Sequence, residues 1–263
     1  MSTVLITGPT AGIGYSLAIK MAEKGYDLLL IARRENRLQE ISLSLQEKYN
    51  VKVNYFVADL KDKNTPQKIY DHAKSLNLDI EILMLNAGYQ INTKLEDASL
   101  EDEEDCLRVL GISVIMLTKL FLSDLKKRNG GYVMVVSSMA AFAPPSGEFA
   151  VLYGPVKTFM NRFVEALNGA YNKHNIYATS ACPGFTITEF HEVSGVQDRM
   201  DKVPSYMKMS SDDVAIESIN GMFKKREVVI TGRLNRFLVG TLKWFPKSLV
   251  KFIGNKLAGG RYK

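Results

Sequence analysis

Cysteine is almost absent from this chain of 263 residues, which contains only Cys106 and Cys182. Two cysteines cannot build a disulfide framework, and this scarcity favours a reducing compartment. Histidine is scarce as well. His72, His174 and His191 lie far apart without the spacing of metal ligands, so we expect no metal site.

Long apolar runs are also missing. No uninterrupted apolar stretch reaches the roughly 18 residues that a membrane-spanning helix needs. The first six residues enter a strand-like run directly and lack the basic region of a signal peptide. These absences predict a soluble, cytoplasmic protein.

Acidic residues are absent from the last part of the chain. Residues 233–263 contain eight Lys or Arg and no Asp or Glu, which leaves 26 basic and 28 acidic residues before position 233. The net charge of +6 therefore belongs to this tail, and a general nucleic-acid-binding role is excluded. We predict one cofactor-binding catalytic domain over 1–232 and a basic amphipathic tail over 233–263. The tail either packs over the substrate pocket or a subunit partner, or contacts an anionic membrane peripherally.

What the chain does contain is a regular alternation of strand-like and helix-like segments. Short apolar, β-branched runs alternate with amphipathic stretches, which is typical of a parallel sheet covered by helices on both faces. The predicted strands are 3–7, 27–32, 51–58, 80–85, 132–136, 176–182 and 228–231. The sequence therefore predicts an α/β fold of the doubly wound, Rossmann type.

A glycine-rich turn follows the first strand. Gly8, Gly12 and Gly14 have the spacing Gly-x3-Gly-x-Gly and come directly before the amphipathic segment 15–24. Glycines let the backbone approach a pyrophosphate, which the positive end of the following helix attracts. The alternative is a tight strand-to-helix connection without a ligand.

The end of the second strand bears on the choice of cofactor. A carboxylate there would bind the ribose 2′-hydroxyl of NAD, but this chain has Ala32, Arg33 and Arg34. Two guanidinium groups can pair with a 2′-phosphate, so we expect NADPH or NADP+ rather than NADH or NAD+. Alternatively, both arginines only begin the solvated helix 35–49.

The ends of the third and fourth strands carry further candidate cofactor contacts. Asp59 and Leu60 follow the third strand, where a carboxylate can receive the adenine amino group. Asn86 ends the fourth strand, and the small residues Ala87 and Gly88 leave room for a ribose.

The candidate catalytic residues begin with a tyrosine and a lysine four residues apart, Tyr153 and Lys157. This spacing places them on one face of a helix. A lysine charge favours the phenolate, so we expect the pKa of Tyr153 to fall below its usual value of about 10. Such a tyrosine can exchange a proton with a carbonyl oxygen. Ser138, with Ser137 as the alternative, can donate a second hydrogen bond to that oxygen.

Together these motifs resemble the short-chain dehydrogenase/reductase superfamily. The series is Thr7-Gly8-x3-Gly12-Ile13-Gly14, Asp59, Asn86-Ala87-Gly88, Ser138, Tyr153-x3-Lys157 and Pro183-Gly184-x3-Thr188. It spans nearly the whole chain. The Ala-Arg-Arg strand end and the basic tail resemble the bacterial branch labelled DltE-like.

The resemblance implies strand order 3-2-1-4-5-6-7 and hydride transfer between a nicotinamide and a carbonyl or alcohol substrate. Ser138, Tyr153 and Lys157 would be catalytic, and a homodimer or homotetramer would be expected. The implied cofactor contacts are Gly8, Thr10, Gly12, Ile13, Gly14, Arg33, Arg34, Asp59, Leu60, Asn86, Ala87, Gly88, Tyr153, Lys157, Pro183, Gly184, Ile187 and Thr188.

The chain departs from the family pattern in two places. Alignment puts Gly111 where the family has an asparagine that holds a water of the proton relay. The interval from Ser138 to Tyr153 is also longer than expected, with the extra residues assigned to 144–149. Two alternatives to a cytoplasmic carbonyl reductase follow. One is a cofactor-binding or scaffold protein with impaired catalysis, and the other is a membrane-surface reductase of lipid carbonyls.

Overall fold

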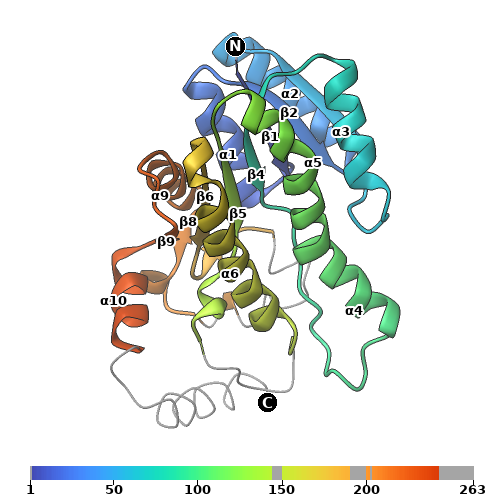
Figure 1. The fold of residues 1–263 in the computed structure, drawn as a ribbon. Coiled ribbons are helices and arrows are strands. Elements are labelled where there is room, and N and C mark those ends of the chain that lie inside the picture. Colours follow the sequence, from blue (N-terminus) through green and yellow to red (C-terminus); the bar gives the residue numbers. More distant parts are fainter. Residues whose placement is uncertain (1, 144–149, 190–199, 202, 243–263) are drawn as a thin grey trace.

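A seven-stranded parallel sheet runs through the centre of the protein, with helices on both faces (Figure 1). The computed structural model describes residues 2–143, 150–189, 200–201 and 203–242. The strand order is β3-β2-β1-β4-β5-β6-β9, which confirms the predicted doubly wound fold. The strands are β1 (Thr3–Thr7), β2 (Asp27–Ala32), β3 (Val53–Val57), β4 (Ile80–Leu85), β5 (Gly131–Val136), β6 (Ile176–Cys182) and β9 (Val228–Ile230).

Successive side chains of the central strands enter two different cores, because neighbouring residues of a strand point to opposite faces. Val4 and Ile6 join the core beneath α1 (Gly12–Glu23), α2 (Glu35–Tyr49) and α9 (Ser211–Phe223). Leu5 joins the core beneath α3 (Thr65–Ser75), α5 (Ser113–Lys127) and α6 (Tyr153–Tyr171). This is why the strands read as continuous apolar runs.

The carboxyl ends of the parallel strands meet along one edge of the sheet. The candidate segments that begin with Gly8, Arg33, Asn86, Ser137 and Pro183 each follow directly after a strand of this sheet. The fold therefore gathers residues that lie far apart in the sequence at one edge, where ligands of such sheets bind.

One helical stretch was longer than the sequence analysis expected. The segments α4 (Leu100–Leu107), the π-helical turn η1 (Arg108–Ile112) and α5 follow one another without a break. By length and composition, Leu100–Lys127 could span a membrane, although Arg108 and Lys119 interrupt its apolar residues. Half of its apolar window is buried inside the fold, where Leu117 and Phe121 join the core. A core helix gives the same signal.

Two elements after β6 were not predicted. β7 (Thr186–Ile187) pairs in parallel with β8 (Met209–Ser210), forming a small second sheet. Such two-residue strands leave no periodic signal in a sequence. The described part of the basic tail forms α10 (Arg233–Leu242), with Val239 buried. The rest of the tail, residues 243–263, lies outside the described residues, so the domain division at 232 stays a prediction.

Candidate active site

The three predicted catalytic side chains converge where β5 meets α6. Tyr153 begins α6, and Lys157 lies one turn later. Ser138 follows β5, and its side chain is hydrogen-bonded to that of Tyr153. The Ser138 hydroxyl oxygen also accepts a 3.1 Å hydrogen bond from the amide of Ala140, which caps the short helix η2 (Met139–Ala141). This cap fixes the hydroxyl beside the phenol.

Ser137 has a different role. Its hydroxyl donates a 3.0 Å hydrogen bond to the main-chain carbonyl of Lys157, and its side chain is buried. This bond ties the end of β5 to α6. Of the two serines considered, Ser138 is therefore the one placed beside Tyr153.

Lys157 is almost completely buried. Its amine donates a 2.8 Å hydrogen bond to the carbonyl of Val136 and lies 5.5 Å from the centroid of the Tyr153 ring. Burial disfavours the charged amine and lowers the pKa of Lys157 to about 8. The lysine therefore changes charge close to neutral pH.

The pKa of Tyr153 moves in the direction opposite to the one expected from the sequence. Burial raises it to about 12, and the hydrogen bond with Ser138 opposes the rise. Lys157 turns its amine to the Val136 carbonyl and carries its charge only below about pH 8. The phenol is therefore a firmly protonated acid in the working pH range.

The glycine turn has the backbone conformation of a phosphate cradle. Gly8 and Gly12 have positive φ angles of 68° and 52°, which other residues rarely adopt. A Cβ on Gly14 would lie 2.0 Å from the carbonyl oxygen of Gly8. Ile13 packs on the core under α1. The turn therefore demands glycine at these positions, which fits a pyrophosphate that must approach the backbone closely.

Asn86 supports this turn from the neighbouring strand. Its side-chain amide donates 3.1 Å hydrogen bonds to the carbonyls of Thr7 and Gly8. The amide of Ala87 donates to the Thr7 hydroxyl at 3.0 Å. The side chain of Asn86 thus holds the glycine turn in shape.

The side chains after β2 and β3 form a charged group beside the turn. Arg34 donates hydrogen bonds to the Thr10 hydroxyl and pairs with Glu189 at 3.0 Å. Arg33 pairs loosely with Asp59 at 3.8 Å. The Leu60 side chain is buried in the sheet core and does not face this charged group. The arginines do more than begin α2, because Arg34 binds the glycine turn.

The segment after β6 lies against the same turn. A Cβ on Gly12 would come within 2.8 Å of the Thr188 side chain. The Pro183 carbonyl accepts a 2.9 Å hydrogen bond from the amide of Met139, which ties this segment to the one after Ser138. Ile187 has 64% of its surface exposed.

Two residues at this site were missed by the sequence analysis. Glu189 follows the last predicted motif directly, and its partner Arg34 is 155 positions away. Asn235 is a buried residue of α10 whose amide donates to the Thr231 carbonyl at 2.8 Å and packs on Gly184. No motif marks either residue, because only the fold brings it to the site.

Because of the π-helical turn, Leu110 rather than Gly111 presents its side chain to the cluster beside Tyr153. A Cβ on Gly111 would meet Val156 and Met160 of α6 at ordinary contact distances of 3.9 and 3.8 Å. The side chain of Leu110 instead lies against Gly88 and belongs to the apolar cluster on which Tyr153 packs. Leu110 therefore contacts Gly88 and also belongs to the cluster on which Tyr153 packs. The longer interval before Tyr153 falls at 144–149, outside the described residues.

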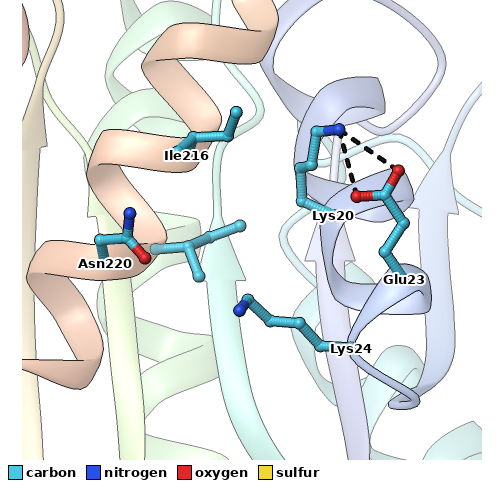
Figure 2. Close-up of a pocket in the computed structure, with 6 residues that line it drawn as sticks. Lys20, Glu23, Lys24, Ile216 and Asn220 are labelled. Atoms are coloured by element: carbon cyan, nitrogen blue, oxygen red, sulfur yellow. Dashed lines mark hydrogen bonds and ion pairs between the residues drawn. The ribbon is translucent and has the colours of Figure 1, made fainter.

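A cleft of ≈330 Å³ lies elsewhere, between α1 and α9. Figure 2 shows Lys20 and Lys24 on its α1 side and Ile216 and Asn220 on its α9 side. It is lined by Lys20, Glu23, Lys24, Ile216, Ile219 and Asn220, none of which is a predicted site residue. This cleft is therefore separate from the candidate active site.

Comparison with known families agrees with this geometry. Residues 2–198 match the short chain dehydrogenase family. The chain belongs to that family. It is therefore an NAD(P)-dependent oxidoreductase, with Tyr153, Lys157 and Ser138 in its matched region.

Relatives of this short-chain dehydrogenase include reductases of fatty-acyl compounds. It is 25% identical over 261 residues to the very-long-chain 3-oxoacyl-CoA reductase of Macaca fascicularis, covering 97% of this chain and 77% of the relative. It is 27% identical to the NADP-dependent 3-hydroxy acid dehydrogenase of Schizosaccharomyces pombe, covering 88% of this chain and 91% of the relative.

Solved structures share the fold. A short-chain dehydrogenase from Sphingobium yanoikuyae in complex with NADPH superposes with a TM-score of 0.82 at 23% identity, covering 94% of this chain and 97% of that one. L-sorbose reductase from Gluconobacter frateurii, complexed with NADPH and L-sorbose, gives a TM-score of 0.77 at 22% identity, covering 88% and 94%.

Proposed function

We propose that this short-chain dehydrogenase is an NADPH-dependent carbonyl reductase, or the corresponding alcohol dehydrogenase in the reverse direction. The observation that carries the proposal is the convergence of Ser138, Tyr153 and Lys157 where β5 meets α6, on the same edge of the sheet as the glycine turn. Tyr153 is a partly buried, protonated phenol that is hydrogen-bonded to Ser138, and Lys157 lies one turn further along α6. These are the parts that protonation of a carbonyl oxygen requires.

Each residue of the site has a separate role in the reaction. The bound cofactor supplies the hydride. Tyr153 gives its proton to the substrate oxygen, and Ser138 donates a second hydrogen bond to that oxygen. The charged Lys157 eases proton release from the phenol, and its amine is held by the Val136 carbonyl. Gly8, Gly12 and Gly14 would hold the pyrophosphate, and Asp59 would lie at the adenine.

The preference for NADPH is supported by the end of β2. Arg33 and Arg34 stand there in place of the carboxylate that would favour NAD, and Thr10 holds the Arg34 guanidinium beside the glycine turn. Guanidinium groups bind phosphates bidentately. The relative from Schizosaccharomyces pombe is itself NADP-dependent.

The test is consumption of NADPH by the purified protein against a panel of ketones, aldehydes and quinones, with NADH in parallel. Turnover with a clear NADPH preference supports the proposal. No turnover, with NADPH binding shown in the same preparation, would favour the alternative of a cofactor-binding scaffold with impaired catalysis.

Carbonyls on acyl chains are the substrate class that the relatives and the surface favour. Six of the relatives, five from mammals and one from duck, are very-long-chain 3-oxoacyl-CoA reductases. Three neighbouring elements expose large apolar side chains, namely Ile187 of β7, Tyr206 just before β8 and Phe237 of α10. A series of 3-oxoacyl thioesters of increasing chain length tests this idea, and a KM that does not fall with chain length contradicts it.

We also make proposals on the cellular location and the oligomeric state of the protein. We propose that the chain belongs to the DltE-like branch, on the strength of the Ala32-Arg33-Arg34 strand end and the basic tail. The resemblance to the family supports a homodimer or homotetramer, and the scarcity of cysteine supports a cytoplasmic location. Peripheral membrane contact through the tail involves residues outside the described ones. Flotation with anionic liposomes, with and without residues 233–263, tests that contact, and size-exclusion chromatography with light scattering tests the assembly.

A further inference from the structure

Arg34 already has a carboxylate partner at the place where it would meet a cofactor phosphate. Its Nε and Nη2 lie 3.2 and 3.0 Å from the Thr10 hydroxyl oxygen, and its Nη1 lies 3.0 Å from Oε2 of Glu189. Thr10 fixes the guanidinium on the glycine turn, so the direction of its remaining N–H groups is set. Glu189 holds one of them.

Glu189 reaches this position because its neighbour rests on the glycine turn. Thr188 lies so close to Gly12 that a Cβ there would be 2.8 Å away. The Glu189 carboxylate is also near Arg37 of α2. The hydrogen bond that Arg37 donates to Glu40 is the main cause that raises the pKa of Arg37, and the charge of Glu189 adds to the rise. The carboxylate therefore stands among the basic side chains at the end of β2.

The ion pair contributes little to the stability of the fold. Both side chains are about half exposed, 51% for Arg34 and 52% for Glu189. Exposed pairs are screened by water and salt and are worth little. The Arg34–Glu189 pair lies where the cofactor phosphate is proposed to bind. This position, and not the small contribution of the pair to stability, suggests a functional role.

We propose that Glu189 competes with the 2′-phosphate of NADPH for Arg34, and so limits the preference for NADPH over NADH. This inference rests on the proposed function, which assigns Arg34 to that phosphate. A phosphate dianion replaces the carboxylate on the guanidinium, and the cost of separating the pair is subtracted from NADPH affinity. A cofactor without the phosphate leaves the pair intact.

The direct test is the dissociation constant of each cofactor, measured by fluorescence titration. We expect Glu189→Gln to tighten NADPH binding about two- to fivefold, the range of exposed ion pairs, and to leave NADH unchanged. The gain should shrink at high salt, because screening already weakens the pair. Glu165→Gln, which removes an exposed partner of Arg162 on α6, is the matched control and should change neither constant.

A double-mutant cycle separates this inference from the function on which it rests. In an Arg34→Gln background, Glu189→Gln should no longer improve NADPH binding. If Arg34→Gln weakens NADPH while Glu189→Gln leaves it unchanged or weakens it, competition by Glu189 is refuted and the phosphate site stands. If Arg34→Gln leaves the NADPH-to-NADH ratio unchanged, the phosphate assignment itself fails, and the inference fails with it.

Discussion

The Lys157 amine donates a 2.8 Å hydrogen bond to the main-chain carbonyl of Val136, the last residue of β5. The position of that carbonyl is set by the sheet, because Val136 pairs with Ala181 of β6. The buried lysine is thus anchored to the main sheet. Only one of its three N–H donors is used by this bond.

Replacement of Tyr153 by Phe should reduce turnover at least a hundredfold, because general-acid catalysis typically contributes 10²–10⁴. The phenyl ring keeps the packing on Leu110 and Val156 but loses the proton and the hydrogen bond with Ser138. NADPH binding should stay within about twofold of the unchanged protein. Steady-state rates and a cofactor titration measure both. Near-normal turnover would remove Tyr153 from its role as acid.

The rate of carbonyl reduction should be level at low pH and fall as the pH rises through about 8. The pKa of Lys157 is lowered to about 8 by burial, whereas that of Tyr153 is raised to about 12. Loss of the lysine charge makes the tyrosine a weaker acid while the phenol is still protonated. The measurement is kcat/KM between pH 6 and 10. Lys157→Arg is the control, because arginine stays charged throughout and should remove the step.

Lys157→Met should stabilise the protein by about 1–2 kcal/mol at pH 7 while abolishing turnover. Burial of the charge costs about 3 kcal/mol for a shift from 10.5 to about 8, and loss of the Val136 hydrogen bond returns part of the gain. Between pH 8 and 10.5 the unfolded lysine binds more protons than the native one, so the unchanged protein gains stability as pH rises. The advantage of the variant should therefore shrink over that range. Urea unfolding at several pH values measures it, and a constant or growing difference would contradict the charge argument.

The sequence predicted the fold and most of the site because both depend on local patterns. The apolar runs gave the strands of the main sheet, and the glycine turn, Asn86 and the Tyr153–Lys157 spacing are each contained in one short segment. The direction of the Tyr153 pKa was wrong because spacing alone does not reveal burial. Glu189 and Asn235 were missed because their partners are distant in sequence. The π-helical turn was missed because one extra residue in a helix hardly alters its periodicity.

The side chain of Leu110 lies in the cluster beside Tyr153. An asparagine there would bring an amide into the cluster that Leu110 forms with Cys106 and Val156, on which Tyr153 packs. We expect the native chain to lack a polar group that returns protons to Tyr153. Leu110→Asn should then raise kcat about tenfold, which is less than a full acid–base group contributes. Burial of the amide should lower the free energy of unfolding by about 1–3 kcal/mol.

Two variants show whether position or polarity matters. Leu110→Ala removes the leucine side chain without adding an amide and should not raise kcat. Gly111→Asn places the amide against Val156 and Met160 of α6 rather than at the Leu110 position, and should give no gain. Steady-state kcat at saturating NADPH, with its solvent deuterium isotope effect, distinguishes them. A gain in Gly111→Asn without one in Leu110→Asn would show that the sequence alignment, and not the side-chain packing, identifies the relay position.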